Sequence, residues 1–451
     1  MAVVSPGSSS GPALRRTLSL TTLLLAGALH AENRVAIITP HNEAIRYEFG
    51  RAFEQWHQEQ FQVPAVVEWR VVGGSSDALK FVQSEFVHKP EGIGLDCFFG
   101  GGQEPYLLLA DKKLLEPFVP GTLAGIPQNF SGVEIYDVNH RWFGAALSSF
   151  GILQNLRVQR RLNLPPAARW EDLTRPELRG WVGAGDPRGS GTMAVMFESF
   201  LQFHGWERGW RMLAQLGGNV RQFDRVSSTT AKDVTLGETA YGLAIDFYGF
   251  TQVAEAGASN LTFVLPRDFT SLSPDGLAIL RGAPHRETAR RFVDFVLSEA
   301  GQKLWFLPRG HPGGPQKNSI ERMTVRPDFY ARFRDVSNIQ HSPFDLPQTF
   351  RYDANLARTR REILPALIGA LLVDPHAELQ AAWQAVIRRG LRESDLAELG
   401  RAPLTEAELA KWAAKEWKEP AFRNAKKIEW QTWAREKYRA LVGAKAGSLA
   451  Q

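Results

Sequence analysis

The stretch RVAIITPHNEAIRYEF, residues 34–49, joins a short apolar strand to an amphipathic helix through a turn at Pro40–Asn42. Residues 34–39 are mostly apolar and rich in β-branched side chains, which favours a buried strand. After the turn, apolar side chains recur at the spacing of one helical face, at Ile45, Phe49, Phe53 and Trp56. The stretch therefore predicts a strand followed directly by a helix that packs on it.

Two more strands follow at short intervals. Residues 65–72 form a second expected strand, which breaks at Gly73–Ser76 before a helix that starts at Asp77. Residues 95–99 form a third expected strand, which ends in Gly100–Gly102. Alternating strands and helices with short turns indicate an α/β layer with a mostly parallel sheet. Because ligands of such sheets bind beyond the carboxyl ends of the strands, the three turns are candidate binding positions.

A second α/β region begins near Trp142. A strand over 181–184 leads into a polar loop at 185–192, and a helix follows that loop. Further strands are expected at 219–223 and 241–246, with a helix capped by Ser227–Thr230 between them. Residues 277–280 and a helix over 286–300 are interpreted as a return to the first layer.

Composition excludes several classes of protein. The chain has 451 residues and a net charge of +5, which is too mild to indicate a nucleic-acid partner. Its single cysteine, Cys97, excludes an intrachain disulfide framework and a cysteine-cluster metal site. Cys97 lies within an apolar strand and is expected to be a buried, inert thiol.

The first residues are typical of an export signal. Arg15 and Arg16 precede a mostly apolar run at 18–29, which is too short to cross a bilayer. Small residues at Ala26–Ala28 offer a cleavage site, and cleavage after Ala31 is a second option. We therefore predict a signal peptide at 1–31 and a mature protein that is periplasmic, soluble and not lipidated.

The last third of the chain differs from the rest. Residues 316–451 are helical in pattern and carry 23 Lys and Arg against 17 Asp and Glu. Apolar faces at 356–371 and at Trp430 and Trp433 predict that this segment docks on the main body, with its basic residues in solvent. Thr405 and Glu408 have the spacing of a capping box.

Several short motifs together carry a family resemblance, and they follow one another in a fixed order along the chain. The motifs are Asp96–Gly101, Leu114–Pro117, Trp170–Leu173, Gly185–Thr192, Pro274–Ile279 and Gly301–Gln302. With the export signal and the opening strand, they cover about residues 33–315. The chain resembles a type 2 periplasmic solute-binding protein of an ABC transporter, in the branch of the ferric-ion-binding proteins.

The resemblance implies an α/β, two-lobed type II periplasmic-binding-protein-like fold, with the solute held in a cleft between the lobes. Lobe 1 would be discontinuous, at 33–140 and 265–315, and lobe 2 would span 141–264. Residues 316–451 lie outside this core and form a helical, basic, Trp-rich C-terminal extension. Such a protein performs no chemistry; it acts as a monomer that delivers its solute to a permease and ATPase complex of the inner membrane, with no nucleic-acid partner.

Helix starts rich in Ser, Thr and Gly predict a small anionic or zwitterionic solute, because unpaired N–H groups and the helix dipole attract anions there. Ordinary N-capping with nothing bound is the alternative for each start. The candidate ligand-binding residues are His41, Asn42, Ser75, Ser76, Gly101, Gly102, Ser190, Gly191, Thr192, Ser228, Thr229, Asp246 and Tyr248.

Ferric iron with a synergistic anion is the alternative ligand, and no cofactor is expected otherwise. His41 and Tyr248 would then be the metal ligands, because the resemblance places a histidine and a Tyr-Tyr pair near these positions. Only Tyr248 remains of that pair, and Gly100–Gly102 occupies the turn where relatives carry an acidic residue. Asp246 could instead pair a cationic group of the solute or hold the hinge.

Two further alternatives rank below transport. A sensor-coupled binding protein would share the same fold, and the sequence does not separate it from an importer component. An exported enzyme is disfavoured because the sequence has no G-x-S-x-G elbow, H-E-x-x-H helix or P-loop.

Overall fold

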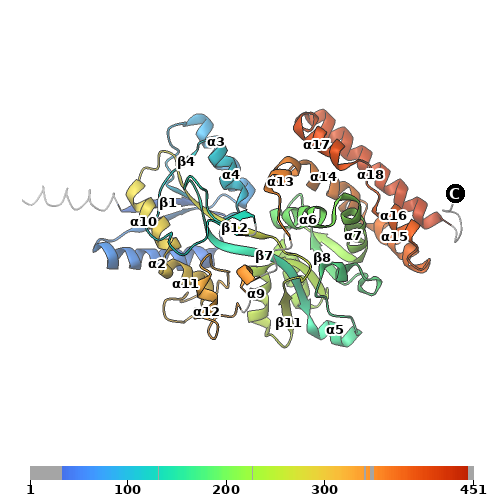
Figure 1. The fold of residues 1–451 in the computed structure, drawn as a ribbon, viewed down its shortest axis with the longest axis horizontal. Coiled ribbons are helices and arrows are strands. Elements are labelled where there is room, and N and C mark those ends of the chain that lie inside the picture. Colours follow the sequence, from blue (N-terminus) through green and yellow to red (C-terminus); the bar gives the residue numbers. More distant parts are fainter. Residues whose placement is uncertain (1–32, 131, 226, 340–341, 346–349, 445–451) are drawn as a thin grey trace, which may run out of the picture. The chain divides into compact units, whose positions relative to one another are not determined.

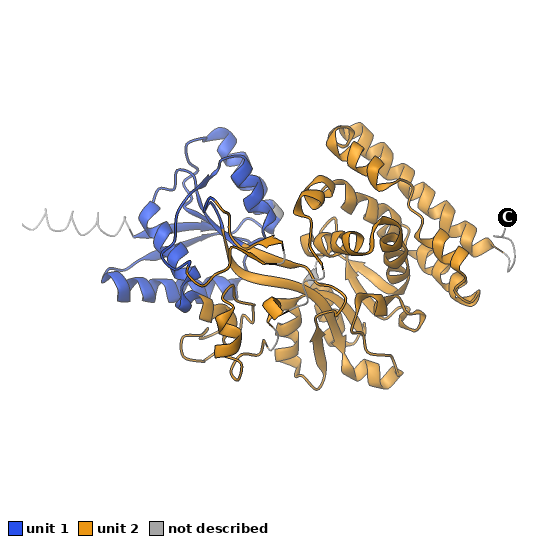
Figure 2. Cartoon of the chain, in the orientation of Figure 1, with its two compact units in different colours: residues 1–123, 139–142, 276–301 blue, residues 124–138, 143–275, 302–451 orange. Residues whose placement is uncertain are grey.

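The computed structural model describes residues 33–130, 132–225, 227–339, 342–345 and 350–444, so the predicted signal peptide lies outside the described residues. The chain divides into two compact units (Figure 2). Unit 1 comprises the described residues of 1–123, 139–142 and 276–301. Unit 2 comprises 124–138, 143–275 and the described residues from 302 onward.

Unit 1 contains a mixed sheet with the order β2-β1-β3-β12 (Figure 1). Strand β1 is parallel to both of its neighbours, and β12 is antiparallel to β3. The sequence predicted these strands because β1 and β3 are apolar on both faces and are buried accordingly. The strands of this unit are β1 (Arg34–Ile38), β2 (Val66–Arg70), β3 (Cys97–Phe99), β4 (Leu115–Glu116) and the second half of β12 (Leu272–Leu280).

Helices connect the strands of unit 1 as the apolar periodicity predicted. The helix expected from Asp77 begins two residues earlier, at Ser75, because Gly74 serves as its N-cap. The cysteine prediction is also confirmed, since Cys97 is fully buried. The helices are α2 (Glu43–Phe61), α3 (Ser75–His88), α4 (Glu104–Asp111), α10 (Arg286–Leu297) and the start of α11 (Glu299–Phe306).

Unit 2 has its own sheet, with the order β7-β10-β8-β9 and β11 on the other side of β7. Strand β8 is parallel to β9 and β10, whereas β7 is antiparallel to β10. The strands are β5 (Asn129–Phe130), β6 (Val133–Glu134), β7 (Phe143–Asn155), β8 (Val182–Gly185), β9 (Val220–Asp224), β10 (Tyr241–Ile245) and β11 (Leu261–Val264). The long strand β7 was not predicted, because a run that is buried throughout lacks the alternation that marks a strand.

Unit 2 contains further helices before α13 (Ala354–Arg360). They are α5 (Leu156–Leu162), α6 (Gly191–His204), α7 (Trp206–Asn219), α8 (Ser227–Leu236), α9 (Asp246–Ala256) and α12 (Asp328–Arg332). Short 3₁₀ turns lie at η1 (Trp170–Thr174), η2 (Pro176–Leu178) and η3 (Pro343–Asp345). The residues Ser227–Thr230, which were expected to cap a helix, form the first turn of α8.

The C-terminal extension is part of unit 2 and is not a separate body. It consists of α13 (Ala354–Arg360), α14 (Ile363–Ile368), the π-helical turn η4 (Gly369–Val373), α15 (His376–Arg388), α16 (Glu393–Gly400), α17 (Glu406–Ala414), η5 (Glu416–Lys418) and α18 (Pro420–Gly443). The predicted capping box is present, since Thr405 Oγ1 accepts the N–H of Glu408. Residues 302–315, which were assigned to lobe 1, also fall in unit 2, where Gln302 donates to the carbonyl oxygen of Ala145 at 2.7 Å.

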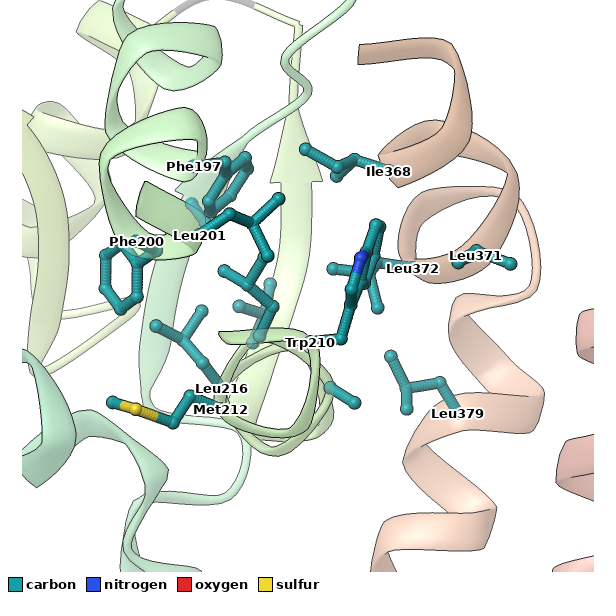
Figure 3. Close-up of a cluster of buried hydrophobic side chains, with 14 of the residues drawn as sticks. Phe197, Phe200, Leu201, Trp210, Met212, Leu216, Ile368, Leu371, Leu372 and Leu379 are labelled. Atoms are coloured by element: carbon teal, nitrogen blue, oxygen red, sulfur yellow. The ribbon is translucent and has the colours of Figure 1, made fainter. Parts of the chain in front are cut away.

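One hydrophobic core joins the extension to the rest of unit 2 (Figure 3). Side chains of α6 and α7, among them Phe197, Leu201 and Trp210, face Ile368 and Leu372 of the extension. Trp430 is also buried in this core, and Trp433 packs against it. The prediction that the extension docks on the main body is therefore confirmed.

Two polar contacts reinforce this core. Arg360 and Glu198 form a buried ion pair at 3.2 Å. The indole N–H of Trp383 donates to the side-chain oxygen of Asn219 at 2.7 Å. Both contacts satisfy polar groups that would be costly to bury alone.

Leu372→Ala is expected to lower the free energy of unfolding of unit 2 by about 2–5 kcal/mol, because it leaves a cavity in the shared core. Ile428→Ala, at a side chain of the extension that is 65% exposed, should change it by less than about 0.5 kcal/mol. Urea unfolding followed by tryptophan fluorescence measures both. Equal effects of the two substitutions would contradict a shared core.

Candidate functional site

In unit 1, the turns that follow β1, β2 and β3 lie against one another. His41 is buried, and its ring meets the edge of Phe99 at 4.5 Å between centroids. A Cβ atom at Gly100 would lie 2.5 Å from His41 Nε2, and one at Gly101 would lie 3.1 Å from Ser75 Oγ. The three turns therefore lie together, and glycine at 100 and 101 permits the close approach.

The backbone imposes glycine in the same turn. Gly100, Gly101 and Gly102 have φ values of +97°, +98° and +79°, a region that other residues rarely adopt. The hydroxyl of Tyr106 anchors this turn, because it lies 2.8 Å from the carbonyl oxygen of Gly100 and 2.6 Å from that of Gly276.

The remaining candidates of unit 1 occupy helix starts. Asn42 caps α2, and its side-chain oxygen accepts the N–H of Ile45 at 3.0 Å, which is the capping alternative. Ser75 is the first residue of α3 and is half-buried, whereas the side chain of Ser76 is not described. Among these candidates of unit 1, the polar group at the turns is thus the half-buried hydroxyl of Ser75, which lies beside Gly101.

In unit 2, the loop between β8 and α6 is held by its own backbone. The N–H of Asp186 donates to the carbonyl oxygen of Asp224 at 2.7 Å, and the N–H of Ser190 donates to that of Asp186 at 3.0 Å. Ser190 Oγ accepts the N–H of Met193 at 3.2 Å, so Ser190 is the N-cap of α6. Its side chain therefore stabilises the helix, and the next residues, Gly191 and Thr192, form the first turn.

The start of α8 lies beside this loop. A Cβ atom at Gly189 would lie 2.9 Å from the carbonyl oxygen of Arg225, which closely precedes α8. Thr230 Oγ1 donates to Asp224 at 2.8 Å and ties the first turn of α8 to the end of β9. The helix starts of α6 and α8 therefore lie at one edge of the sheet, beyond the carboxyl ends of β8 and β9.

Three hydroxyl groups at these starts have no hydrogen-bond partner within the part of the chain that the structure describes. They belong to Thr192, Ser228 and Thr229, which are half-buried or exposed. The first N–H groups of each helix also have no intrahelical acceptor. This edge combines unpaired donors with the positive ends of two helix dipoles.

Arg225 was missed by the sequence analysis. It follows β9, is exposed, and its guanidinium has no partner among the described residues. The sequence pattern that could have identified Arg225 is an arginine at a strand end shortly before a run of Ser and Thr. This combination suits a phosphate or carboxylate group.

Asp246 lies at the carboxyl end of β10 and is fully buried, so a ligand does not reach it in this conformation. Its Oδ1 accepts the N–H of Phe247 at 2.8 Å. Burial raises the pKa of Asp246 to about 7, and the nearby charge of Arg322 opposes the shift. Of the two interpretations of Asp246, its surroundings therefore favour an internal role over pairing with a solute.

Arg322 is the centre of that surrounding cluster. It is buried, forms an ion pair with Asp275, and donates to Ser148 Oγ at 2.7 Å. Its guanidinium lies over the rings of Phe247 and Trp305, at 4.7 and 5.2 Å from their centroids. The cluster links strands β7 and β12 to the start of α9.

Tyr248 is half-buried and packs with Phe247, at 4.3 Å between ring centroids. Burial raises the pKa of its phenol, which disfavours the phenolate that would bind ferric iron. Within the described ranges, no group of three or more His, Cys, Asp or Glu side chains lies close enough to hold a metal ion. Iron binding through His41 and Tyr248 therefore stays a prediction.

The raised pKa of Asp246 predicts a pH dependence of stability. Between about pH 4 and pH 7 the folded protein keeps a proton that the unfolded chain has lost, so this group's contribution to the free energy of unfolding falls as the pH rises. Asp246→Asn removes this dependence and should stabilise the protein more at about pH 8 than at about pH 5. Urea unfolding at both pH values measures it, with the exposed Asp335→Asn as control. An equal effect at both pH values would contradict the shifted pKa.

A family model matches the centre of the chain. Residues 101–320 match the bacterial extracellular solute-binding proteins. The phosphoglycerate transport regulatory protein PgtC of Salmonella typhimurium is 27% identical over 296 residues, which cover 64% of this chain and 69% of that protein. In the described residues, no helix has both the length and the apolar character that a membrane span requires.

Solved structures share the fold at low sequence identity. The periplasmic binding protein AfuA from Actinobacillus pleuropneumoniae, with fructose-6-phosphate bound, is 19% identical with a TM-score of 0.54, over 85% of this chain and 97% of that one. The periplasmic binding protein P5PA is 22% identical with a TM-score of 0.56, over 76% and 99%. The apo ferric ion-binding protein A of Pasteurella haemolytica is 14% identical with a TM-score of 0.52, over 82% and 100%.

These matches confirm the resemblance and the fold class that the motifs predicted. This chain shares the α/β architecture of those structures, and its described residues after 316 form a helical region. Residues 101–320 are therefore similar to the bacterial extracellular solute-binding proteins, and the chain has the fold of the periplasmic binding proteins, including the ferric-ion-binding ones.

Proposed function

We propose that this protein is the periplasmic binding component of an ABC importer and captures a small solute through a phosphate or carboxylate group. The observation that carries the proposal is the edge of unit 2 where α6 and α8 begin. There, the hydroxyls of Thr192, Ser228 and Thr229 and the guanidinium of Arg225, which have no partner among the described residues, accompany two helix N-termini. All of these groups donate hydrogen bonds or carry positive potential, so the edge is suited to an anion.

The strength of such a site is sufficient for specific capture. Each hydrogen bond to a charged group contributes about 1.5–3 kcal/mol, and a helix terminus adds up to about 2 kcal/mol in a partly buried setting. Two or three such contacts distinguish an anionic solute from a neutral one by several orders of magnitude.

The relatives favour phosphate over carboxylate. PgtC is named for phosphoglycerate transport, and AfuA was solved with fructose-6-phosphate. A phosphate group has three acceptor oxygens, which suits an edge with several donors and an arginine. We therefore propose a small phosphorylated metabolite, such as a phosphoglycerate or a sugar phosphate, as the solute class.

The same residues bear on the proposal that the protein binds its solute without chemistry. The proposed edge offers hydroxyl and N–H donors but neither a nucleophile paired with a base nor a metal centre among the described residues. We propose that the protein is not an enzyme, that it acts as a monomer, and that a permease and ATPase receive the solute.

Isothermal titration with 3-phosphoglycerate, fructose 6-phosphate and inorganic phosphate tests the proposal. Wild-type protein should bind at least one of them, and Arg225→Gln should weaken that binding about 10- to 100-fold, because it removes a charge-assisted hydrogen bond. Arg161→Gln is the matched control, since Arg161 is an exposed arginine of unit 2 on α5, away from the edge where α6 and α8 begin. Failure to bind any of the three, or an equal loss in both variants, would overturn the proposal.

Iron binding is checked in the same preparation. Addition of ferric iron should give no tyrosinate charge-transfer band if the solute is an anion bound as proposed. A band that Tyr248→Phe abolishes would establish the iron alternative in its place.

A further inference from the structure

We propose that the C-terminal extension fixes the position of the loop at residues 186–192, and that Asp374 and Gln431 are positioning residues for the anion site. The inference rests on the proposed function, because it concerns the loop that leads into the start of α6. It assigns a role to residues 316–451, which lie outside the core that the family resemblance covers.

The first link is Arg188, within that loop. Its guanidinium makes hydrogen bonds to both oxygens of Asp186, at 2.8 to 3.1 Å. The same guanidinium makes two parallel hydrogen bonds to Asp374 of the extension, at 2.9 and 3.0 Å. The two carboxylates raise the pKa of Arg188 above its usual value, chiefly through the hydrogen bonds to Asp186, although burial opposes this. Arg188 therefore joins its own loop to a segment 186 residues later in the chain.

The second link fixes Asp374. It directly follows the π-helical turn η4, and its N–H donates to the carbonyl oxygen of Gly369 at 2.9 Å. Gln431 of α18 donates to Asp374 Oδ2 at 2.6 Å. Asp374 is thus held from two elements of the extension, and both elements contribute to the shared core.

Close packing supports the same contact. A Cβ atom at Gly369 would lie 2.5 Å from Arg188 Nε, so glycine lets the arginine lie against η4 in its present position. The helix that follows the loop, α6, is packed by Phe197 and Leu201 into the core that contains Ile368 and Leu372 (Figure 3). The extension thus holds both the loop and the helix whose first turn would bind the anion.

The charges define what this arrangement does. Two carboxylates on one guanidinium leave a net negative charge, which by itself would weaken the binding of an anion nearby. The contact must then favour binding by ordering the loop. A loop that is already in its binding conformation loses less conformational entropy when the solute binds. The two effects have opposite signs, so a single substitution separates them.

Asp374→Asn keeps the shape of the side chain and weakens its hold on Arg188. If positioning dominates, the affinity for the phosphorylated probe that wild-type protein binds should fall about three- to tenfold, measured by titration with 3-phosphoglycerate and fructose 6-phosphate. If charge alone matters, the affinity should rise or stay unchanged, and that result would overturn the inference. Glu378→Gln is the matched control, because it also converts a carboxylate of the extension, one paired with Arg435 and Arg439, into an amide.

A measurement without solute separates this inference from the proposed function. Amide hydrogen exchange of ligand-free protein at residues 186–193 should be about tenfold faster in Asp374→Asn than in wild type, and unchanged in Glu378→Gln. Unchanged exchange in Asp374→Asn would overturn the inference whether or not the probes bind. If wild-type protein binds none of the probes, the proposed function fails, and faster exchange would still support the role of the extension in ordering the loop.

Discussion

The hydrophobic core that unit 2 shares with the C-terminal extension is the constraint on which the rest of this unit depends. Helices α6 and α7 present large apolar side chains on the side away from the sheet, and these would face water without the extension. Burial of Trp210, Leu372 and Trp383 closes that face. Because α6 is fixed by this packing, the loop before it and the start of α8 beside it are also fixed. The proposed anion edge is thus built on a helix that is covered on its outer face.

Capping and binding are not exclusive at this edge. Ser190 caps α6 with its hydroxyl oxygen and Asn42 caps α2 with its side-chain amide oxygen, so both residues serve the helices. The hydroxyls of Thr192, in the first turn of α6, and of Ser228 and Thr229, in the first turn of α8, have no hydrogen-bond partner in the described part of the chain. Because the N-cap position is filled by one residue, these further hydroxyls are available to the proposed solute.

A buried charged cluster lies where strands β7 and β12 meet the start of α9. Arg322 pairs with Asp275 and stacks between Phe247 and Trp305, and Asp246 lies nearby with a pKa raised to about 7 by burial. Removal of either Arg322 or Asp275 would leave a buried charge without its partner, which is costly. The sequence singled out Asp246 and Tyr248 as ligand contacts. The packing of both residues instead favours a role in holding this part of unit 2.

The sequence by itself determined the order of strands and helices in the α/β regions, because apolar periodicity and glycine turns are local signals. It also located the three turns of unit 1 and the loop of residues 185–192, since the rule on strand ends depends only on that order. It did not reveal β7, whose continuous burial hides the alternation of a strand. Nor did it single out Arg225, whose exposure and lack of a partner are properties of the folded chain. The contact of Arg188 with Asp374 joins residues 186 positions apart, and no local pattern encodes such a contact. Only the tertiary structure decided which helix starts share an edge and which hydroxyls stay unpaired, because both depend on packing between segments that are distant in the chain.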